Sequence, residues 1–265
     1  MTKYIKTFMR YRYLLMNFIE RDIKVKYRRS VLGLLWSVLN PLLMMAVIST
    51  VFSTVMRISV ANFHLYYLTA AVVYNFISEA TNGAMTSVFT SGAIMKKVYI
   101  PKYIFPLEKV LFSFVNMLFS LIAVLIVIII TMVVNPGSVS FSWTMLLFPI
   151  PLIMALIFSF GLGLLLAAAT VFFRDIMHLY GVFLTAWMYA TPIIWDMASM
   201  QNPLILTIMK FNPMYYYVTF FRDVMIYNRV PSIPFMLAGL ACAVVMLLIG
   251  LAVFKKKQDM FVLYM

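Results

Sequence analysis

"ERDIKVKYRRSVLGLLWSVLNPLL", residues 20–43, joins a dense group of Lys and Arg side chains directly to an apolar segment. A basic run by itself is consistent with nucleic-acid binding, with contact to anionic lipid, or with a signal that sets orientation in a membrane. The apolar segment stays free of charged residues from residue 34 to residue 56. A helix of about 20 such residues crosses the apolar core of a bilayer. The stretch therefore predicts a membrane span preceded by a cationic segment.

The composition of the whole chain supports the same class. Of 265 residues, 65% are hydrophobic and 11% are charged, whereas soluble domains have about 45–50% apolar and about 25% charged residues. The net charge of +13 would favour nucleic acid in a soluble protein. In so apolar a chain the placement of the charges matters more, and we expect no nucleic-acid partner. The single cysteine, Cys242, lies in an apolar run, which excludes a disulfide framework.

Six apolar segments are each long enough for a transmembrane helix. They are residues 34–56, 65–90, 107–134, 143–172, 178–197 and 232–254. Pro149 and Pro151, near the start of the fourth segment, indicate a kink or an interfacial first turn. The sequence thus predicts an all-α polytopic membrane protein.

The Lys and Arg residues are distributed unevenly between the two predicted membrane faces. Nine lie in residues 1–30, four in residues 91–109, one at position 174 and three in the tail from residue 255, all on one face. The other face has only Arg57, Lys210, Arg222 and Arg229. Because short, positively charged loops stay in the cytoplasm, we expect both termini to be cytoplasmic.

Residues 1–30 are predicted to form an amphipathic helix at the membrane surface. At about 100° per residue, one face is apolar and the opposite face is basic. The apolar face comprises Ile5, Phe8, Met9, Leu15, Met16, Ile19, Ile23 and Tyr27, and the basic face Lys3, Lys6, Arg10, Arg21, Lys24 and Arg28. Arg12 and Lys26 fall on the apolar face, so either the helix breaks or these side chains extend to water. The helix is either only an anchor or also a contact for a partner.

The outer segment 198–230 contains apolar runs that are too short to cross a bilayer. Asn202-Pro203 and Asn212-Pro213 interrupt them. Two half-helices that dip into the membrane and return would explain this pattern, and they require cover by protein or a water-filled cavity. The alternative is an amphipathic loop on the membrane surface.

Signatures of an enzyme are missing. The chain has no Gly-Lys pair and hence no G-x-x-x-x-G-K-[ST] phosphate loop, so it cannot hydrolyse ATP by that route. His64 and His178 lie near opposite predicted faces and make no metal pair. Glu79 is the one acid well inside a predicted span. It either pairs with a polar neighbour such as Asn75 or Asn82 or serves an ion or substrate pathway.

Aromatic side chains are abundant, with 23 Phe, 16 Tyr and 4 Trp. Many belong to the belts at the two membrane interfaces. Tyr74, Trp187, Tyr189 and Trp195 lie deeper in predicted spans. They either pack between helices or line a path for an amphipathic glycan, because aromatic faces contact sugar rings and lipid chains alike.

Four segments together resemble ABC-2-type permeases that export polysaccharides, namely the O-antigen, teichoic-acid and rhamnan exporters. They are "RDIKVKYRRSVLGLLWSVLNPLL" (21–43), "MKKVYIPKYIFPLEKV" (95–110), "FFRDIMHLYGVFLTAWMYATPIIW" (172–195) and "FNPMYYYVTFFRD" (211–223). They follow the family order and cover nearly the whole chain. One departure is "NRVP", residues 228–231, where the family pattern has a Gly near the Pro.

The resemblance implies a single transmembrane domain that works as half of a transporter in the bacterial cell membrane. Two copies would pair with two ABC ATPase subunits on the cytoplasmic side, and ATP and Mg²⁺ would bind only to those subunits. The cargo would be a glycan on a polyprenyl-diphosphate lipid. The basic helix would lie beside the ATPase and help to transmit its motion.

The resemblance also suggests roles for individual residues. The ATPase-coupling residues would be Lys96, Lys97, Tyr99, Pro101, Arg174 and Asp175, although the lysines also fit a role in topology alone. The lipid headgroup, or its diphosphate, would meet Arg21, Lys24, Arg28 and Arg29. The translocation path or its outer gate would include Tyr74, Glu79, Trp187, Tyr189, Trp195, Tyr215, Tyr216, Tyr217, Phe220 and Arg222.

Three other functions are weighed against this one. A permease for a drug or another lipid shares the fold, because fold does not determine cargo. A secondary carrier or channel would need no ATPase, and a neighbouring gene for a P-loop ATPase would argue against it. A polytopic glycosyl or acyl transferase needs a paired acid or His–acid site, which the sequence does not offer.

Overall fold

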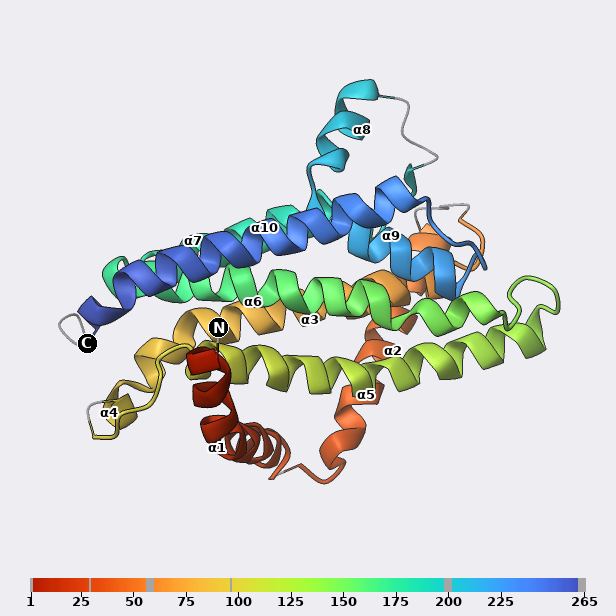
Figure 1. Cartoon of the computed structure of the whole chain (residues 1–265). Coiled ribbons are helices and arrows are strands. Elements are labelled where there is room, and N and C mark those ends of the chain that lie inside the picture. Colours follow the sequence, from red (N-terminus) through yellow and green to blue (C-terminus); the bar gives the residue numbers. More distant parts are fainter. Residues whose placement is uncertain (1, 29, 56–59, 96, 198–201, 262–265) are drawn as a thin grey trace.

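The chain is described by a computed structural model that covers residues 2–28, 30–55, 60–95, 97–197 and 202–261. Within these residues every regular element is a helix. Four long helices lie side by side at the centre of the molecule (Figure 1). They are α3 (Phe63–Thr90), α5 (Ile104–Val134), α6 (Pro149–Phe172) and α10 (Ile233–Lys257). α3 packs against α5 on one side and α6 on the other, and α10 packs against α6.

Glycines permit the closest helix pair of this bundle. A Cβ atom added to Gly250 of α10 would lie 2.0 Å from the carbonyl oxygen of Gly161 in α6. A Cβ atom added to Gly161 would lie 2.5 Å from the backbone of Leu247. Small residues allow such backbone contact in membrane proteins, where van der Waals packing rather than the hydrophobic effect drives helix association.

Four helical stretches are long and apolar enough to cross a membrane: Gly33–Ser53, Ile104–Val134, Trp143–Phe172 and Ile233–Met260. They coincide with four of the six predicted spans. The segment 65–90 forms the 28-residue helix α3, but polar residues lower its hydropathy. The fifth predicted span, 178–197, is shorter than expected, because α7 (Ile176–Tyr189) ends at Tyr189. Pro192 explains this end, since proline lacks an N–H group and disfavours helix at the residue before it.

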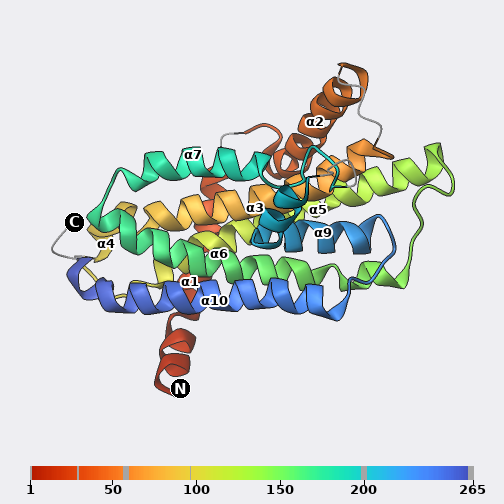
Figure 2. The ribbon, with the colours of Figure 1, turned by 90° about the horizontal axis from the view of Figure 1, so that it is seen from above.

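The N-terminal helix α1 (Thr2–Tyr27) is unbroken, so Arg12 and Lys26 do not interrupt it. It crosses the direction of the bundle (Figure 2) and packs against α5. Some of its apolar side chains are buried and others are exposed. Leu15 is buried against the start of α5, whereas Met9 and Met16 of the predicted apolar face are exposed. After a 3₁₀ turn at Gly33–Leu35, α2 (Trp36–Thr50) packs on α3 and α5.

The segment after α7 contains two short helices. α8 (Pro203–Lys210) projects from the bundle in Figure 1. Its main helix contact within the described residues is with α9. α9 (Pro213–Met225) packs against α3, α6 and α10. Asn212 caps α9, because its side-chain oxygen accepts from the N–H of Met214 at 3.0 Å, and Pro213 supplies a first helical residue with a preset φ angle.

The connections gather at two opposite ends of the bundle (Figure 1). At one end lie α4 (Gly92–Met95), the α6–α7 turn and the last turn of α10. Lys102, in the loop before α5, donates to the carbonyl of Gln258, directly after α10, at 2.5 Å. The α5–α6 and α9–α10 connections lie at the other end.

Candidate functional site

A polar groove lies between α3 and α5. On α3, Asn75, Glu79, Asn82 and Thr86 follow steps of four, three and four residues, which place them on one face of a helix. On α5, the same steps separate Lys109, Ser113, Asn116 and Ser120. The two rows line one continuous surface, because Glu79 and Ser113 border both hollows that the rows enclose.

The groove has a wide part and a narrow inner part. The wide part, of about 570 Å³, is lined by Glu79, Asn82, Gly83, Thr86, Lys109, Phe112 and Ser113. The inner part, of about 50 Å³, extends to Asn75, Asn116, Ser120 and Pro41 of α2. Gly83 lets the stem of Lys109 approach α3, because an added Cβ atom there would lie 3.2 Å from the Cβ of Lys109.

The end of α1 closes one side of this groove. Lys26 forms an ion pair with Glu79 at 2.7 Å, and Asn116 donates to the same carboxylate oxygen at 3.5 Å. Tyr27 shares a hydrogen bond with Ser37 of α2 at 2.6 Å. Glu79 therefore takes its partners from two other helices rather than from Asn75 or Asn82. Lys26 sits on the apolar face of α1 because it enters the polar groove.

A second ion pair joins α1 to α5. Asp22 accepts a hydrogen bond from Lys109 and pairs with Arg21 at 2.8 Å. Burial by itself raises the pKa of Asp22, but the hydrogen bonds from Lys109 and Arg21 outweigh it and hold that pKa below its ordinary value. Asp22 is therefore ionised at neutral pH, and α1 is held to the bundle by two charge pairs one helical turn apart.

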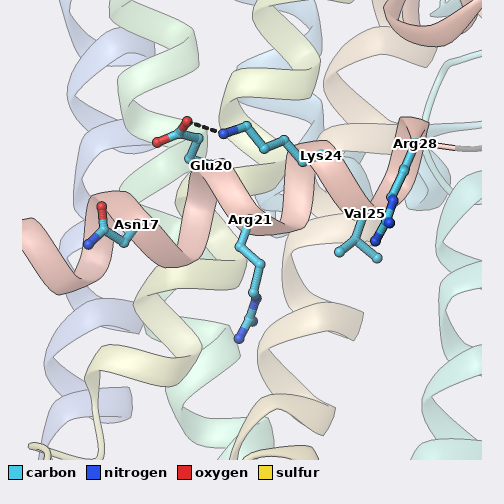
Figure 3. A pocket seen from close by; sticks show the side chains of 6 residues that line it. All are labelled: Asn17, Glu20, Arg21, Lys24, Val25 and Arg28. Atoms are coloured by element: carbon cyan, nitrogen blue, oxygen red, sulfur yellow. Dashed lines mark hydrogen bonds and ion pairs between the residues drawn. The ribbon is translucent and has the colours of Figure 1, made fainter.

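The outward face of α1 carries the predicted headgroup residues. Arg21, Lys24 and Arg28 line an open hollow of about 530 Å³ with Asn17, Glu20 and Val25 (Figure 3). Glu20 pairs with Lys24 at 2.5 Å, which lowers the pKa of this exposed carboxyl. Arg21 extends to another side of the helix. Arg29 lies outside the described residues.

The predicted coupling residues before α5 lie at one end of the bundle. Lys97 and Tyr99 are exposed, and Pro101 is half-buried. The carbonyl of Tyr99 accepts from the hydroxyl of Tyr11 at 3.2 Å, so this loop is attached to α1. Lys96 lies outside the described residues.

The second predicted coupling pair lies at the same end. Arg174 and Asp175 form the exposed turn between α6 and α7. The Arg174 guanidinium lies 4.7 Å from the ring centre of Phe89, near the end of α3. The structure thus brings the turn at Arg174 next to the α3–α4 connection that precedes Lys97.

Several predicted path residues form hydrogen bonds within the bundle. Tyr74 is buried and donates to the carbonyl of Leu184 at 2.6 Å. Trp187 donates to Asn212 at 2.7 Å, and Trp195 donates to the carbonyl of Tyr189 at 3.0 Å. The Tyr189 side chain is exposed on the surface of α7.

The aromatic residues of α9 are divided between core and surface. Tyr217 and Phe220 are fully buried in the central core. Tyr215 and Tyr216 are half-buried and contact the ring of Phe235 at 5.6 and 4.9 Å between ring centres. Within one copy of the chain, Tyr217 and Phe220 are therefore packing residues.

Arg222 connects three parts of the chain that are distant in sequence. Its side chain is 4% exposed. It donates to the carbonyls of Tyr66, Pro192 and Ile193 at distances of 2.6 to 3.3 Å, and its guanidinium lies 3.4 Å from the ring centre of Tyr66. The non-helical stretch after α7 is thereby tied to α3 and α9. The backbone carbonyl of the neighbouring residue, Asp223, accepts from the N–H of Arg229 at 2.9 Å.

The sequence did not predict four members of the groove. Lys26 and Asn116 bind Glu79, and Lys109 pairs with Asp22. A signal was present. Two helical segments carry polar residues at identical spacings inside otherwise apolar stretches, and polar side chains within membrane helices are costly unless they serve a partner or a cavity. The pairing of α1 with these rows is a tertiary contact and has no local signal.

We expect a charge reversal to test the link between α1 and α3. Lys26→Glu or Glu79→Lys alone places like charges together and should lower the melting temperature of the purified protein by several degrees. Lys26→Glu combined with Glu79→Lys should recover most of the loss, because the pair is restored in the opposite sense. The same reversal at the exposed pair Glu20 and Lys24 is the matched control and should change little. No recovery in the double variant would contradict the link.

The comparisons with known proteins agree on one family. The ABC-2 type transporter family matches residues 13–226, a range that includes the whole polar groove. Over 263 residues the chain is 28% identical to the O-antigen export system permease protein RfbA of Myxococcus xanthus, covering 98% of each chain. Two proteins of the same name from Klebsiella pneumoniae are 28% and 27% identical, each over 94% of this chain and 93% of the relative. The chain belongs to the ABC-2 type transporter family.

Proposed function

We propose that this protein is the permease subunit of an ATP-driven exporter that moves a polyprenyl-diphosphate-linked polysaccharide from the cytoplasm to the outer side of the cell membrane. The observation that carries the proposal is the similarity to O-antigen export permeases over 98% of both chains. The polar groove supports it, because a path for sugars needs hydrogen-bonding groups within an otherwise apolar bundle.

The proposed arrangement in the membrane has six spans with both termini in the cytoplasm. The four apolar stretches that contain α2, α5, α6 and α10 supply four spans, and α3 and α7 supply the other two. α3 is screened from lipid by its neighbours, which offsets its polar row. α8 and α9 would form the outer re-entrant segment, with α9 covered by α3, α6 and α10 as such a segment requires.

The proposed assembly has two permease copies and two ATPase subunits. The end of the bundle that carries Lys97, Tyr99, Pro101, Arg174 and Asp175 would face the ATPase. Attachment of Tyr99 to Tyr11 supports this placement, because motion at the loop would be transmitted directly to α1. ATP and Mg²⁺ would bind to the partner subunit alone.

The outward face of α1 would receive the anionic part of lipids. Arg21, Lys24 and Arg28 outnumber Glu20 around their hollow, and Arg side chains bind phosphate oxygens with paired hydrogen bonds. Among the predicted aromatic path residues, Tyr189 is exposed and Trp187, Trp195, Tyr215 and Tyr216 are half-buried. These side chains would be the aromatic contacts of the glycan nearer the outer side.

We expect Lys97→Gln combined with Arg174→Gln to weaken coupling. Both side chains are exposed at one end of the bundle, so their loss should leave folding unchanged and reduce permease-stimulated ATP hydrolysis several-fold. Lys210→Gln, also exposed but in the outer segment, is the control and should have no effect. Unchanged stimulation in the double variant would mean that these cations serve topology only.

A depletion experiment tests the proposed function. Cells that lose the protein should retain their lipid-linked polysaccharide inside and lose it from the surface, as measured by surface staining of intact and permeabilised cells. Expression of the intact chain should restore surface staining. Normal surface polysaccharide in depleted cells would overturn the proposal.

A further inference from the structure

We infer that the groove between α3 and α5 holds a neutral, hydroxyl-rich sugar segment of the exported molecule, apart from its diphosphate. The inference rests on the proposed function and assigns one part of the cargo to one part of the chain. It concerns a groove within a single copy, bounded by α1, α2, α3 and α5.

The charges of the groove favour a neutral ligand. Two cations, Lys26 and Lys109, are matched by two carboxylates, Glu79 and Asp22. A further carboxyl, that of Glu108, lies 3.4 Å from Lys109 and is buried. No cation is left in excess among these groups, so a diphosphate would gain little there. Around the outward hollow of α1, Arg21 pairs with Asp22 and Lys24 pairs with Glu20, and Arg28 adds a further cation, so this hollow suits the diphosphate better.

The uncharged groups of the groove suit sugar hydroxyls. Side-chain amides of Asn75 and Asn82 each offer donors and an acceptor. Within the described part of the chain, neither amide is engaged in a hydrogen bond to protein, Asn75 is exposed, and Asn82 is half-buried at the wall of the wide part. Phe112 borders the same wall, with the Lys26 ammonium 5.4 Å from its ring centre. The ring adds an apolar surface that the C–H face of a sugar ring can contact.

The size and position of the groove also suit a short sugar segment. Its wide part, about 570 Å³, falls in the range of about 300–1,000 Å³ found for small-molecule sites. The groove is level with the end of α1, which closes one side through Lys26 and Tyr27. A sugar chain leaving the membrane surface would thus meet the groove beside the hollow that takes its diphosphate.

A photo-crosslink in the complete exporter tests the inference. Phe112 is replaced by the photoreactive benzoylphenylalanine in cells fed a radiolabelled sugar, and the permease is purified under denaturing conditions after irradiation. Mild acid then cleaves the bond between the sugar and the diphosphate. We expect radiolabel on the permease that survives this acid, because the crosslink is to the sugar. Asn82→Leu in the same background should reduce the adduct at least fivefold.

The controls separate failure of the inference from failure of the proposed function. Benzoylphenylalanine at Leu237, an exposed position on α10, should give no acid-stable sugar adduct. An adduct at position 112 that loses its label in acid would place the prenyl diphosphate part of the carrier, and not the sugar, in the groove and overturn the inference. Absence of any adduct at 112, in cells whose surface polysaccharide depends on the protein, would also overturn it and leave the proposed function standing. Surface polysaccharide that does not depend on the protein would overturn both.

Discussion

Arg222→Gln should abolish or severely reduce the yield of folded protein, and any folded fraction should melt at a much lower temperature. The substitution removes a guanidinium that satisfies the carbonyls of Tyr66, Pro192 and Ile193 inside the protein. Carbonyls left without a donor in the interior, and the lost charged hydrogen bonds, together cost about 3 kcal/mol or more. Thermal unfolding and size-exclusion profiles in detergent measure the effect.

Arg229 provides the matched control for this prediction. It lies four residues after the end of α9 and is exposed, so Arg229→Gln should leave the melting temperature almost unchanged. Arg222→Lys should recover only part of the loss, because one ammonium cannot reproduce the planar fork of donors. A melting temperature for Arg222→Gln equal to that of Arg229→Gln would show that the hydrogen bonds of Arg222 contribute nothing to stability.

Gly250→Ala should separate α6 from α10 and destabilise the bundle. The new methyl group would lie 2.0 Å from the carbonyl oxygen of Gly161, and backbone atoms cannot rotate away as a side chain can. Overpacking of this kind costs about 1–3 kcal/mol, and a clash with backbone lies at the upper end. Gly161→Ala should behave in the same way, because its Cβ would lie 2.5 Å from Leu247.

Gly181→Ala is the control for this pair. An added Cβ there has no neighbour within 4 Å, and alanine is a better helix former than glycine by about 0.8–1.0 kcal/mol. Gly181→Ala should therefore be neutral or slightly stabilising in the same thermal unfolding assay. Equal melting temperatures for Gly250→Ala and Gly181→Ala would contradict the close contact of α6 and α10.

The sequence is sufficient to predict the helical class, and four of its apolar segments become helices of spanning length. Hydropathy identifies these segments because each is nearly free of charge. It also indicates the amphipathic helix at the N-terminus and the breaks at Asn212-Pro213. It overestimates the length of α7, because the apolar run continues beyond the point where Pro192 ends the helix.

The sequence is less informative about which side chains face one another. The sequence predicts a place for Tyr217 and Phe220 in the outer gate, but it does not predict their burial in the core beside α3, α6 and α10. Lys26 looks misplaced on an apolar face until α3 supplies Glu79 as its partner, 53 residues away. Such pairings depend on tertiary contacts, which hydropathy and helical periodicity do not encode.

The central claim is that this chain moves a polysaccharide only together with an ATPase. The most direct test reconstitutes the purified permease into liposomes that contain the lipid-linked glycan, with and without the proposed P-loop ATPase subunit. Accessibility of the glycan to an impermeant lectin measures its transfer across the bilayer. We predict transfer that requires both subunits and ATP and that stops with vanadate. Equal transfer by the permease alone, or ATP hydrolysis by the complex without any movement of glycan, would contradict the claim.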